Sequence, residues 1–304
     1  MVNGNGHTRA SVLTEIASTW VTPRVDVLGV GISAIDMSTA LHLIDQWILQ
    51  GDCRYICVTG VHGVMESQRD PVVRHVHNRS GLTVPDGMPL VWAGWAAGAR
   101  HMDRVYGPDL MLAACERAAA RGYSSFFYGG RPGVAERLTA RLVGAFPGLK
   151  IVGTYAPPFR ELSAQEDENV VQLISAAQPD LVWVGLGTPK QELWMAAHAH
   201  RIDAGVLIGV GAAFDIHAGL TRQAAHWMQR SGLEWAFRLA QEPRRLWRRY
   251  LYNNPRFVAG VARRPPCLVP VTGEASATGD PLLPVPRLLA AGPKPPGVVT
   301  DDSG

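Results

Sequence analysis

The stretch PDLVWVGLGTPKQELWMAAHAHRIDAGVLIGVGAAFDIHAG, residues 179–219, decides the fold. It contains two short apolar runs, 181–184 and 206–210, of the kind found in strands buried on both faces of a parallel sheet. Each run ends in a glycine turn, and a helical segment joins the first turn to the second run. Ligands of open parallel sheets bind beyond the carboxyl ends of the strands. We therefore expect one crevice lined by Thr188, Lys190, Gln191 and Asp215. The alternative is that the glycines only make tight turns.

The rest of the chain repeats this alternation of apolar runs and amphipathic segments. Further strands are expected at 25–30, 54–59, 82–84, 124–128 and 150–153, each followed by a turn and a helix. This order predicts an α/β fold: a mostly parallel, Rossmann-like sheet with helices on both faces and a C-terminal helical appendage. The expected divisions are a loose leader at 1–23, a core at 24–231, the appendage at 232–264, and a disordered tail rich in Pro, Gly and Ala at 265–304.

The composition is that of a globular protein. Of 304 residues, 47% are hydrophobic and 18% are charged, and the net charge is only +3, which disfavours nucleic acid as a partner of the whole molecule. No apolar run approaches the roughly 20 residues of a membrane-spanning helix. The N-terminus lacks the apolar core of a signal peptide, so we expect a cytoplasmic protein. The four cysteines have no metal-finger spacing, and neither a metal site nor a disulfide framework is expected.

The appendage has an unusual charge pattern. Residues 232–264 carry eight arginines but only two acidic residues, Glu234 and Glu242, with aromatic side chains interleaved. Such helices lie in membrane interfaces, and arginine pairs with phosphate in bidentate fashion. Contact with a membrane or a diphosphate therefore ranks first. A terminal helix that packs on the core with a solvated basic face ranks second, and a nucleic-acid surface ranks a distant third.

Asp86 is the candidate catalytic residue. It follows a very short strand and precedes a helix, whose dipole would keep its carboxylate ionised. The simpler alternative is that Asp86 caps this helix. The glycine-rich turn GGRPG at 129–133 could hold phosphate oxygens through its N–H groups, or could simply connect strand and helix. A carboxylate beside phosphate-binding groups suits transfer from a nucleotide-linked donor: the carboxylate takes a proton from the acceptor hydroxyl, and arginines stabilise the departing diphosphate.

Six motifs, in order, carry a resemblance to a known family. They are VPDGMPLVW (84–92), RVYGPDL (104–110), FYGGRPGVAE (127–136), PDLVWVGLGTPKQE (179–192), GVGAAFDIHAG (209–219) and LEWAFRLAQEPRRLWRR (233–249). Together they make the chain resemble the WecG/TagA/CpsF family of bacterial glycosyltransferases over about residues 25–257. Each motif is weak alone, but the set in this order is specific.

The resemblance implies an inverting, metal-independent hexosyltransferase without a cofactor. It would move a sugar of the N-acetylmannosamine type from a UDP-sugar to a polyprenyl-diphosphate (undecaprenyl) acceptor, at the cytoplasmic face of the membrane. The product would belong to a teichoic acid, enterobacterial common antigen or exopolysaccharide. Asp86 would be the general base, and the appendage would dock the enzyme on the membrane. The expected substrate-binding residues are Thr59, His62, Arg104, Gly129, Gly130, Gln191, Asp215, Arg238, Arg245 and Arg248.

Two motifs depart from the family pattern. The family's Thr-x-Asn is here Thr59-Gly60-Val61-His62, so His62 either replaces the asparagine or has no catalytic role. The family's Arg-x-Pro is here Arg222-Gln223-Ala224. The alternative function is a non-catalytic nucleotide-sugar-binding or membrane-docking module of the same fold. An NAD-dependent oxidoreductase is disfavoured because GxGxxG is missing. Self-association into a homo-oligomer stays open.

Overall fold

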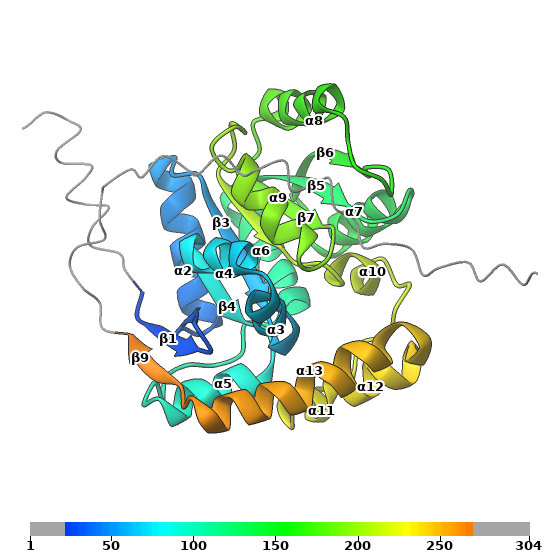
Figure 1. The fold of residues 1–304 in the computed structure, drawn as a ribbon. Coiled ribbons are helices and arrows are strands. Elements are labelled where there is room, and N and C mark those ends of the chain that lie inside the picture. The colour runs from blue at the N-terminus through cyan, green and yellow to red at the C-terminus, as the bar shows by residue number, and fades with distance from the viewer. Residues whose placement is uncertain (1–21, 270–304) are drawn as a thin grey trace, which may run out of the picture.

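A six-stranded parallel sheet forms the centre of the protein (Figure 1). The computed structural model describes residues 22–269. The strand order is β4-β3-β8-β7-β5-β6, which confirms the predicted α/β class. The strands are β3 (Arg54–Thr59), β4 (Leu82–Pro85), β5 (Ser124–Gly129), β6 (Lys150–Tyr155), β7 (Leu181–Gly185) and β8 (Val206–Gly209). The central strands have almost wholly buried side chains, as expected for apolar runs covered on both faces.

Helices cover both faces of the sheet, and each face has its own hydrophobic core. One core joins the sheet to α2, α6, α7 and α10, and the other joins it to α4, α8 and α9. The helices of the α/β core are α2 (Met37–Gln50), α3 (Val61–Arg69), α4 (Pro71–Arg79), α5 (Met88–Ala96), α6 (Gly107–Arg121), α7 (Val134–Ala145), α8 (Ala164–Ala177), α9 (Lys190–His198), α10 (Ala213–His217) and α11 (His226–Arg230).

The first expected strand, residues 25–30, is in fact a hairpin. Strands β1 (Arg24–Val27) and β2 (Val30–Ser33) pair antiparallel, with Val27 opposite Val30. Leu28 and Gly29 between them both have positive φ, which is the conformation of the tight two-residue turns that fit the twist of a hairpin. The prediction failed here because leucine rarely adopts positive φ.

A third strand completes this small sheet. Strand β9 (Cys267–Val269) pairs antiparallel with β1. Residues 267–269 had been expected in the disordered tail, and their pairing is a correction to that boundary. The remaining tail and residues 1–21 lie outside the described part of the chain.

The appendage consists of α12 (Glu234–Gln241) and α13 (Pro243–Arg263), and α13 runs along one side of the core toward β9 (Figure 1). It packs through Phe257 into a third hydrophobic core formed by the β1–β2 hairpin, α3 and α5. Gly260 lies against Leu28, where an added Cβ would stand 3.0 Å from the leucine side chain. The appendage is therefore attached to the core along α13 and again through β9.

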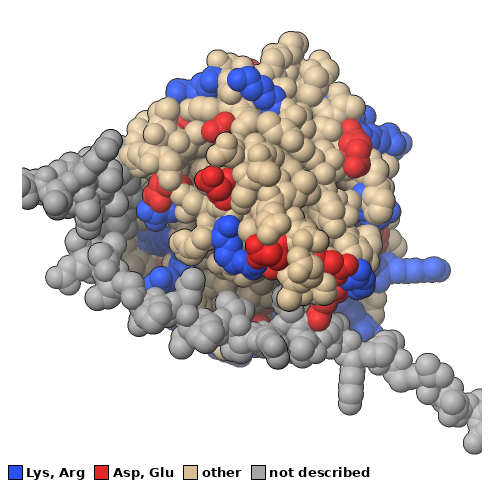
Figure 2. Space-filling view, turned by 90° about the horizontal axis from the view of Figure 1, so that it is seen from above, with Lys and Arg blue, Asp and Glu red and all other residues tan. Residues whose placement is uncertain are grey.

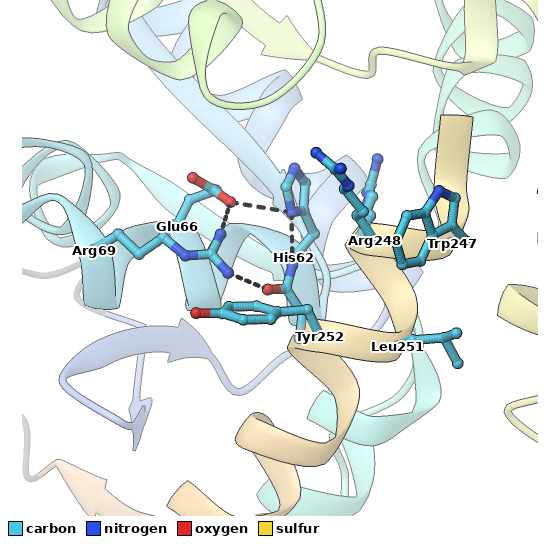
Figure 3. Close-up of a pocket in the computed structure, with 9 residues that line it drawn as sticks. His62, Glu66, Arg69, Trp247, Arg248, Leu251 and Tyr252 are labelled. Carbon is cyan, nitrogen blue, oxygen red and sulfur yellow. Dashed lines mark hydrogen bonds and ion pairs between the residues drawn. The ribbon is translucent and has the colours of Figure 1, made fainter. Parts of the chain in front are cut away.

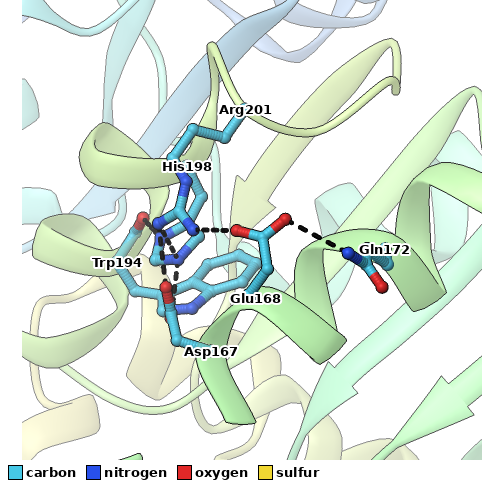
Figure 4. A network of polar contacts seen from close by, with 6 residues as sticks. All are labelled: Asp167, Glu168, Gln172, Trp194, His198 and Arg201. Carbon is cyan, nitrogen blue, oxygen red and sulfur yellow. Dashed lines mark hydrogen bonds and ion pairs between the residues drawn. The ribbon is translucent and has the colours of Figure 1, made fainter. Parts of the chain in front are cut away.

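Away from the appendage, a polar network joins α8 to α9 (Figure 4). His198 lies 2.8 Å from Asp167, and Arg201 pairs with Asp167 at 2.8 Å and with Glu168 at 3.0 Å. Trp194 stacks on the imidazole of His198 with 4.4 Å between ring centroids.

The face of the molecule seen in Figure 2 carries Lys and Arg beside Asp and Glu, with no continuous stripe of one sign.

Candidate functional site

Asp86 lies at the carboxyl end of β4 and is held from two sides. Its N–H donates to the carbonyl of Thr59 at the end of β3 (2.9 Å), and its Oδ1 accepts from the N–H of Gly107, the first residue of α6 (2.9 Å). The positive end of the α6 dipole thus faces the carboxylate. Asp86 does not cap α5, whose N-cap is Gly87 without a side-chain bond. Oδ2 has no hydrogen-bond partner among residues 22–269, so it is available to accept a proton.

Arg104 joins the Asp86 loop to the appendage. Its Nε donates to the backbone oxygen of Asp86 (2.6 Å), and its Nη1 donates to Oε1 of Gln229 in α11 (2.9 Å). Its Nη2 forms an ion pair with Glu234, the first residue of α12. The guanidinium carbon stands 3.9 Å from the ring centroid of Tyr106. Because the protein occupies the guanidinium on all these sides, the geometry favours a role for Arg104 in positioning the loop.

Glu234 and Arg238 bring opposite charges from α12 to this cluster. Burial raises the pKa of Glu234, the charge of Asp86 raises it further, and Arg104 opposes the change. Burial would lower the pKa of Arg238, but Tyr250 and Tyr106, and then Glu234 and Asp86, together raise it. Burial also raises the pKa of Tyr106, whose side chain is hydrogen-bonded to Glu234. Arg238 is thus within electrostatic reach of Asp86.

The turns after β5 and β7 approach each other without side chains between them. Gly129 has φ +122°, and an added Cβ would stand 2.6 Å from the carbonyl carbon of Gly185. The N–H of Gly130 donates to the Gly185 oxygen (3.0 Å). Nearby, Arg131 lies 3.4 Å from Asp215 and so joins the loop after β5 to α10. The turns after β5 and β7 therefore meet backbone to backbone at this point.

Two of the expected substrate-binding side chains are buried and hydrogen-bonded inside the protein. The Thr59 hydroxyl lies 2.9 Å from Nε2 of His77. The Gln191 amide donates to the Gly209 carbonyl (3.1 Å) and accepts from the Gly187 N–H (3.2 Å). Both side chains therefore connect neighbouring segments of the protein. Their contact with a substrate stays a prediction.

His62 lies on α3 and bridges two parts of the protein. Asn253 of α13 approaches its Nδ1 through Nδ2 (3.2 Å), and Arg69 donates to the other end of that amide, Oδ1. Nδ1 also lies 3.5 Å from Oε1 of Glu66, and the ring is hydrogen-bonded to the backbone of Thr188. Burial lowers the pKa of His62 to about 3, assisted by the charges of Arg249 and Arg69. The imidazole is therefore neutral and links α13 to the loop after β7.

The arginines of α13 differ in their surroundings. Arg245 is 62% exposed and pairs with Glu242 at 2.6 Å. Arg248 is exposed and lines a cavity beside His62 (Figure 3). Arg249 lines the same cavity, and its Nε is buried without a hydrogen-bond partner in the described chain. The structure thus brings Asp86 and Arg104 together with Arg238. Arg245 instead pairs with Glu242, the N-cap residue of α13.

The described residues contain no group of three or more His, Cys, Asp or Glu side chains placed to hold a metal ion. Within 22–269, none of the helices combines the length and apolarity that crossing a membrane requires.

Comparison with known proteins gives the family. The family model described as "Glycosyl transferase WecG/TagA/CpsF family" matches residues 25–266. The chain belongs to this family. It is a glycosyltransferase, as the motif resemblance implied. Three relatives carry the name N-acetylglucosaminyldiphosphoundecaprenol N-acetyl-beta-D-mannosaminyltransferase. The Bacillus spizizenii protein is 28% identical over 73% of this chain and 84% of its own length. The Bacillus subtilis protein is 31% identical over 62% of this chain and 71% of its own length. The Staphylococcus aureus strain MW2 protein is 26% identical over 80% of this chain and 93% of its own length.

Sequence reasoning about this WecG/TagA/CpsF glycosyltransferase missed three residues of the site. Glu234 was noted only as one of two acids in a basic segment, although its ion pair with Arg104 joins appendage and core. Arg249 was one arginine among eight, and Asn253 drew no attention. Both lie on the face of α13 that meets His62. Their spacing of four residues, one helical turn, is the only signal that places them together.

Proposed function

We propose that this enzyme transfers an N-acetylmannosamine-type sugar from a UDP-sugar to a polyprenyl-diphosphate-linked sugar, with inversion and without a metal. The acceptor hydroxyl needs one base, and Asp86 supplies it through Oδ2. The proton passes from the acceptor hydroxyl to Oδ2 while the new glycosidic bond forms. The bond between the sugar and the UDP oxygen breaks, and UDP leaves as an anion that arginine side chains stabilise. The names of the relatives support the sugar and the class of acceptor.

The position of Asp86 is the observation that carries the proposal. Oδ1 is fixed by the Gly107 N–H, while Oδ2 has no partner in the described chain. The carboxylate stands at the carboxyl edge of the parallel sheet, where open α/β folds bind ligands. The negative charge of Asp86 also favours the charged forms of Arg238 and Arg249 in the appendage. A base next to unpaired guanidiniums suits a reaction that moves a proton and releases a phosphate anion.

The donor would lie across the glycine turns after β5 and β7. The glycine-rich turn after β5 precedes α7, and backbone N–H groups of such turns can hold phosphate oxygens. Asp215, at α10 beside Arg131, is suited to bind sugar hydroxyls. Thr59 and Gln191 would support this site through the hydrogen bonds that fix the surrounding loops. Arg238, Arg245 and Arg248 would supply positive charge for the diphosphate from the appendage.

The appendage would dock the enzyme on the inner face of the cell membrane. Apolar side chains of α13 are exposed beside its arginines: Trp247 is 47% exposed and Leu251 is 59% exposed. Trp227 and Trp235 extend this exposure onto α11 and α12. Exposed aromatic side chains among arginines are typical of helices that lie in the membrane interface. Such docking would bring the site to an acceptor that is anchored in lipid.

The test is a UDP-release assay with a panel of UDP-sugars and a polyprenyl-diphosphate-GlcNAc analogue, with and without EDTA. The expected result is release that depends on the acceptor, occurs with one donor and survives EDTA. Release that needs a metal would contradict the metal-independent mechanism. No acceptor-dependent release with any donor, in a protein that still binds UDP, would favour the non-catalytic module instead.

A further inference from the structure

A buried carboxyl group lies directly behind the turn that joins β7 to α9 (Figure 1). It belongs to Glu192, which is in the first turn of α9 and is 0% exposed. Its Oε1 accepts one hydrogen bond from the Thr188 hydroxyl (2.9 Å) and another from the Gln191 amide (3.1 Å). The proposed reaction gives this acid no part, so its presence at the edge of the site needs an explanation.

The second oxygen of this carboxyl group has no partner. Oε2 is buried and makes no hydrogen bond within residues 22–269. Burial raises the pKa of Cys57 in β3, and the charge of Glu192 raises it further, so the carboxyl group also lies close to β3. A buried polar oxygen without a partner destabilises the fold, and an apolar side chain would fill the same space without that cost. The acid is therefore explained by the two bonds of Oε1 and not by packing.

The first of these bonds to be considered fixes the amide of Gln191. Its Nε2 donates to Glu192 and to the Gly209 carbonyl, and its Oε1 accepts from the Gly187 N–H. An added Cβ on Gly209 would stand 3.1 Å from Nε2, and one on Gly211 would stand 3.3 Å from Oε1, so the amide has little room to turn. Because both N–H groups of the amide are used, the side chain joins the turn after β7 to the end of β8.

The second bond holds Thr188, which is within the turn itself. The Thr188 hydroxyl donates to Glu192, and the Thr188 backbone is hydrogen-bonded to the imidazole of His62 on α3. Thr188 is only partly buried, and it lies at the carboxyl edge of the sheet, where ligands of open α/β sheets bind. The Gly185 carbonyl beside this turn accepts from the Gly130 N–H in the turn after β5. A shift of the turn after β7 would therefore also reach the turn after β5.

We infer that Glu192 is a positioning residue for sugar transfer: its carboxyl group holds Thr188 and Gln191, and through them the turn after β7 that borders the donor. Glu192 does not touch the reacting atoms, because it is fully buried behind the turn. The position requires an oxygen that accepts two hydrogen bonds, which glutamine can supply and leucine cannot. The inference rests on the proposed function for UDP as the part of the donor that this turn meets.

Binding and hydrogen exchange test this inference without turnover. Calorimetry measures the affinity of the full chain for UDP, and mass spectrometry measures amide exchange in a peptide that covers residues 185–191. Glu192→Leu should weaken UDP binding by at least about fivefold, the factor that corresponds to one lost hydrogen bond, and should speed up exchange in the peptide. Glu192→Gln should stay within about twofold of the wild type, because its amide oxygen still accepts from Thr188 and Gln191.

A matched pair at Thr188 tests the same bond from the other side. Thr188→Val keeps the shape of the side chain without the hydroxyl and should weaken UDP binding as Glu192→Leu does. Thr188→Ser keeps the hydroxyl and should bind UDP as the wild type does. Ile174→Ala, at a fully buried position of α8, separates positioning from stability. It should lower the temperature of thermal unfolding and leave UDP affinity and exchange in residues 185–191 unchanged.

Three results would overturn the inference: wild-type UDP affinity in Glu192→Leu, an equal loss in Ile174→Ala, or equal losses in Glu192→Gln and Glu192→Leu. If Glu192→Leu did not fold, the Thr188 pair would decide, and equal binding by Thr188→Val and Thr188→Ser would count against Glu192. If the wild-type protein did not bind UDP, the proposed donor would fail and exchange would decide alone. Faster exchange in Glu192→Leu than in Ile174→Ala would then keep Glu192 as the residue that holds the turn, and equal exchange would exclude it.

Discussion

The Nε of Arg104 donates a 2.6 Å hydrogen bond to the backbone oxygen of Asp86. The same guanidinium forms an ion pair with Glu234 at the start of α12. The candidate base and the appendage are thus joined through one side chain, which is 10% exposed. A change in the position of α12 would reach the Asp86 loop directly. This connection makes the appendage part of the site and gives its removal a consequence beyond the loss of membrane contact.

Replacing the base should remove turnover and leave the protein folded. We expect Asp86→Asn to lower kcat by about 10²–10⁴-fold, the usual contribution of a general base, while UDP binding changes little. The amide keeps the shape of the side chain and can still accept from the Gly107 N–H. UDP release and calorimetry with UDP measure the two effects. The control is Asp203→Asn, which changes an exposed carboxylate before β8. Wild-type turnover in Asp86→Asn would exclude Asp86 as the base.

The ion pair between Arg104 and Glu234 should show strong coupling. Breaking a buried pair by removing one partner costs about 3–5 kcal/mol, because the other charge is left unpaired. We therefore expect Arg104→Met to destabilise the protein by an amount of this order and Glu234→Gln by less. The double variant should recover part of the loss. Urea unfolding of all four proteins gives the coupling energy, and strictly additive changes would show that the pair does not act as a unit.

The buried neutral imidazole of His62 should make stability fall in acid. Its folded pKa of about 3 lies below the ordinary value of 6.5, so the unfolded chain binds a proton that the folded chain does not. The contribution of His62 to the free energy of unfolding is then fully present above pH 6.5. It declines as pH falls from 6.5 toward 3, by at most about 1.4 kcal/mol per pH unit. Urea unfolding at pH 7.5 and pH 5 measures it. His62→Gln should flatten the decline, while His75→Gln, an exposed histidine of α4, should not.

A matched pair of glycine variants tests the contact between the strand ends. Gly129→Ala would place a Cβ 2.6 Å from the Gly185 backbone at φ +122°, so we expect a loss of several kcal/mol, about 2 or more. Gly144→Ala, in α7 with open space around its Cβ, should stabilise by about 0.5–1 kcal/mol. Thermal unfolding compares the two. Equal stability of both variants would mean that β5 and β7 do not approach so closely.

The exposed apolar side chains of α13 should govern membrane binding. Trp247→Ser combined with Leu251→Ser should reduce binding to vesicles with anionic lipid, while stability stays within about 0.5 kcal/mol because both positions are exposed. Sedimentation with vesicles measures the bound fraction. Leu49→Ser on α2, where the leucine is 70% exposed, is the control and should bind as the wild type does. Unchanged binding of the double variant would remove α13 as the docking surface.

The central sheet could be predicted from the sequence because each of its inner strands is a short run of apolar residues. An apolar run such as 181–184 has no alternative to burial on both faces, and the observed β7 spans Leu181–Gly185. Asp86 could be singled out for a similar reason, since strand end and helix start fix where it lies. Its actual partner, the Gly107 N–H, is 21 residues away and could not be assigned from local pattern.

The rest depended on contacts between distant segments. His62 and Asn253 are 191 residues apart, and no periodicity in either segment indicates that they meet. Neighbouring arginines on α13 looked equivalent in sequence. Arg245 pairs with Glu242 three residues earlier, whereas Arg249 turns toward α3, and only the packing of the helix separates the two cases.

The pairing of β9 with β1 changes how α13 responds to load. A helix attached to the core at one end only could rotate away from it about that end. Here the preceding helix α12 is fixed by the Arg104–Glu234 pair, α13 is fixed near its middle by Asn253, and the chain after α13 is fixed by the strand pair. The two helices of the appendage are therefore held to the core at three separate points. Pressure on the exposed face of α13 would press the helix against α3 instead of lifting it from the core.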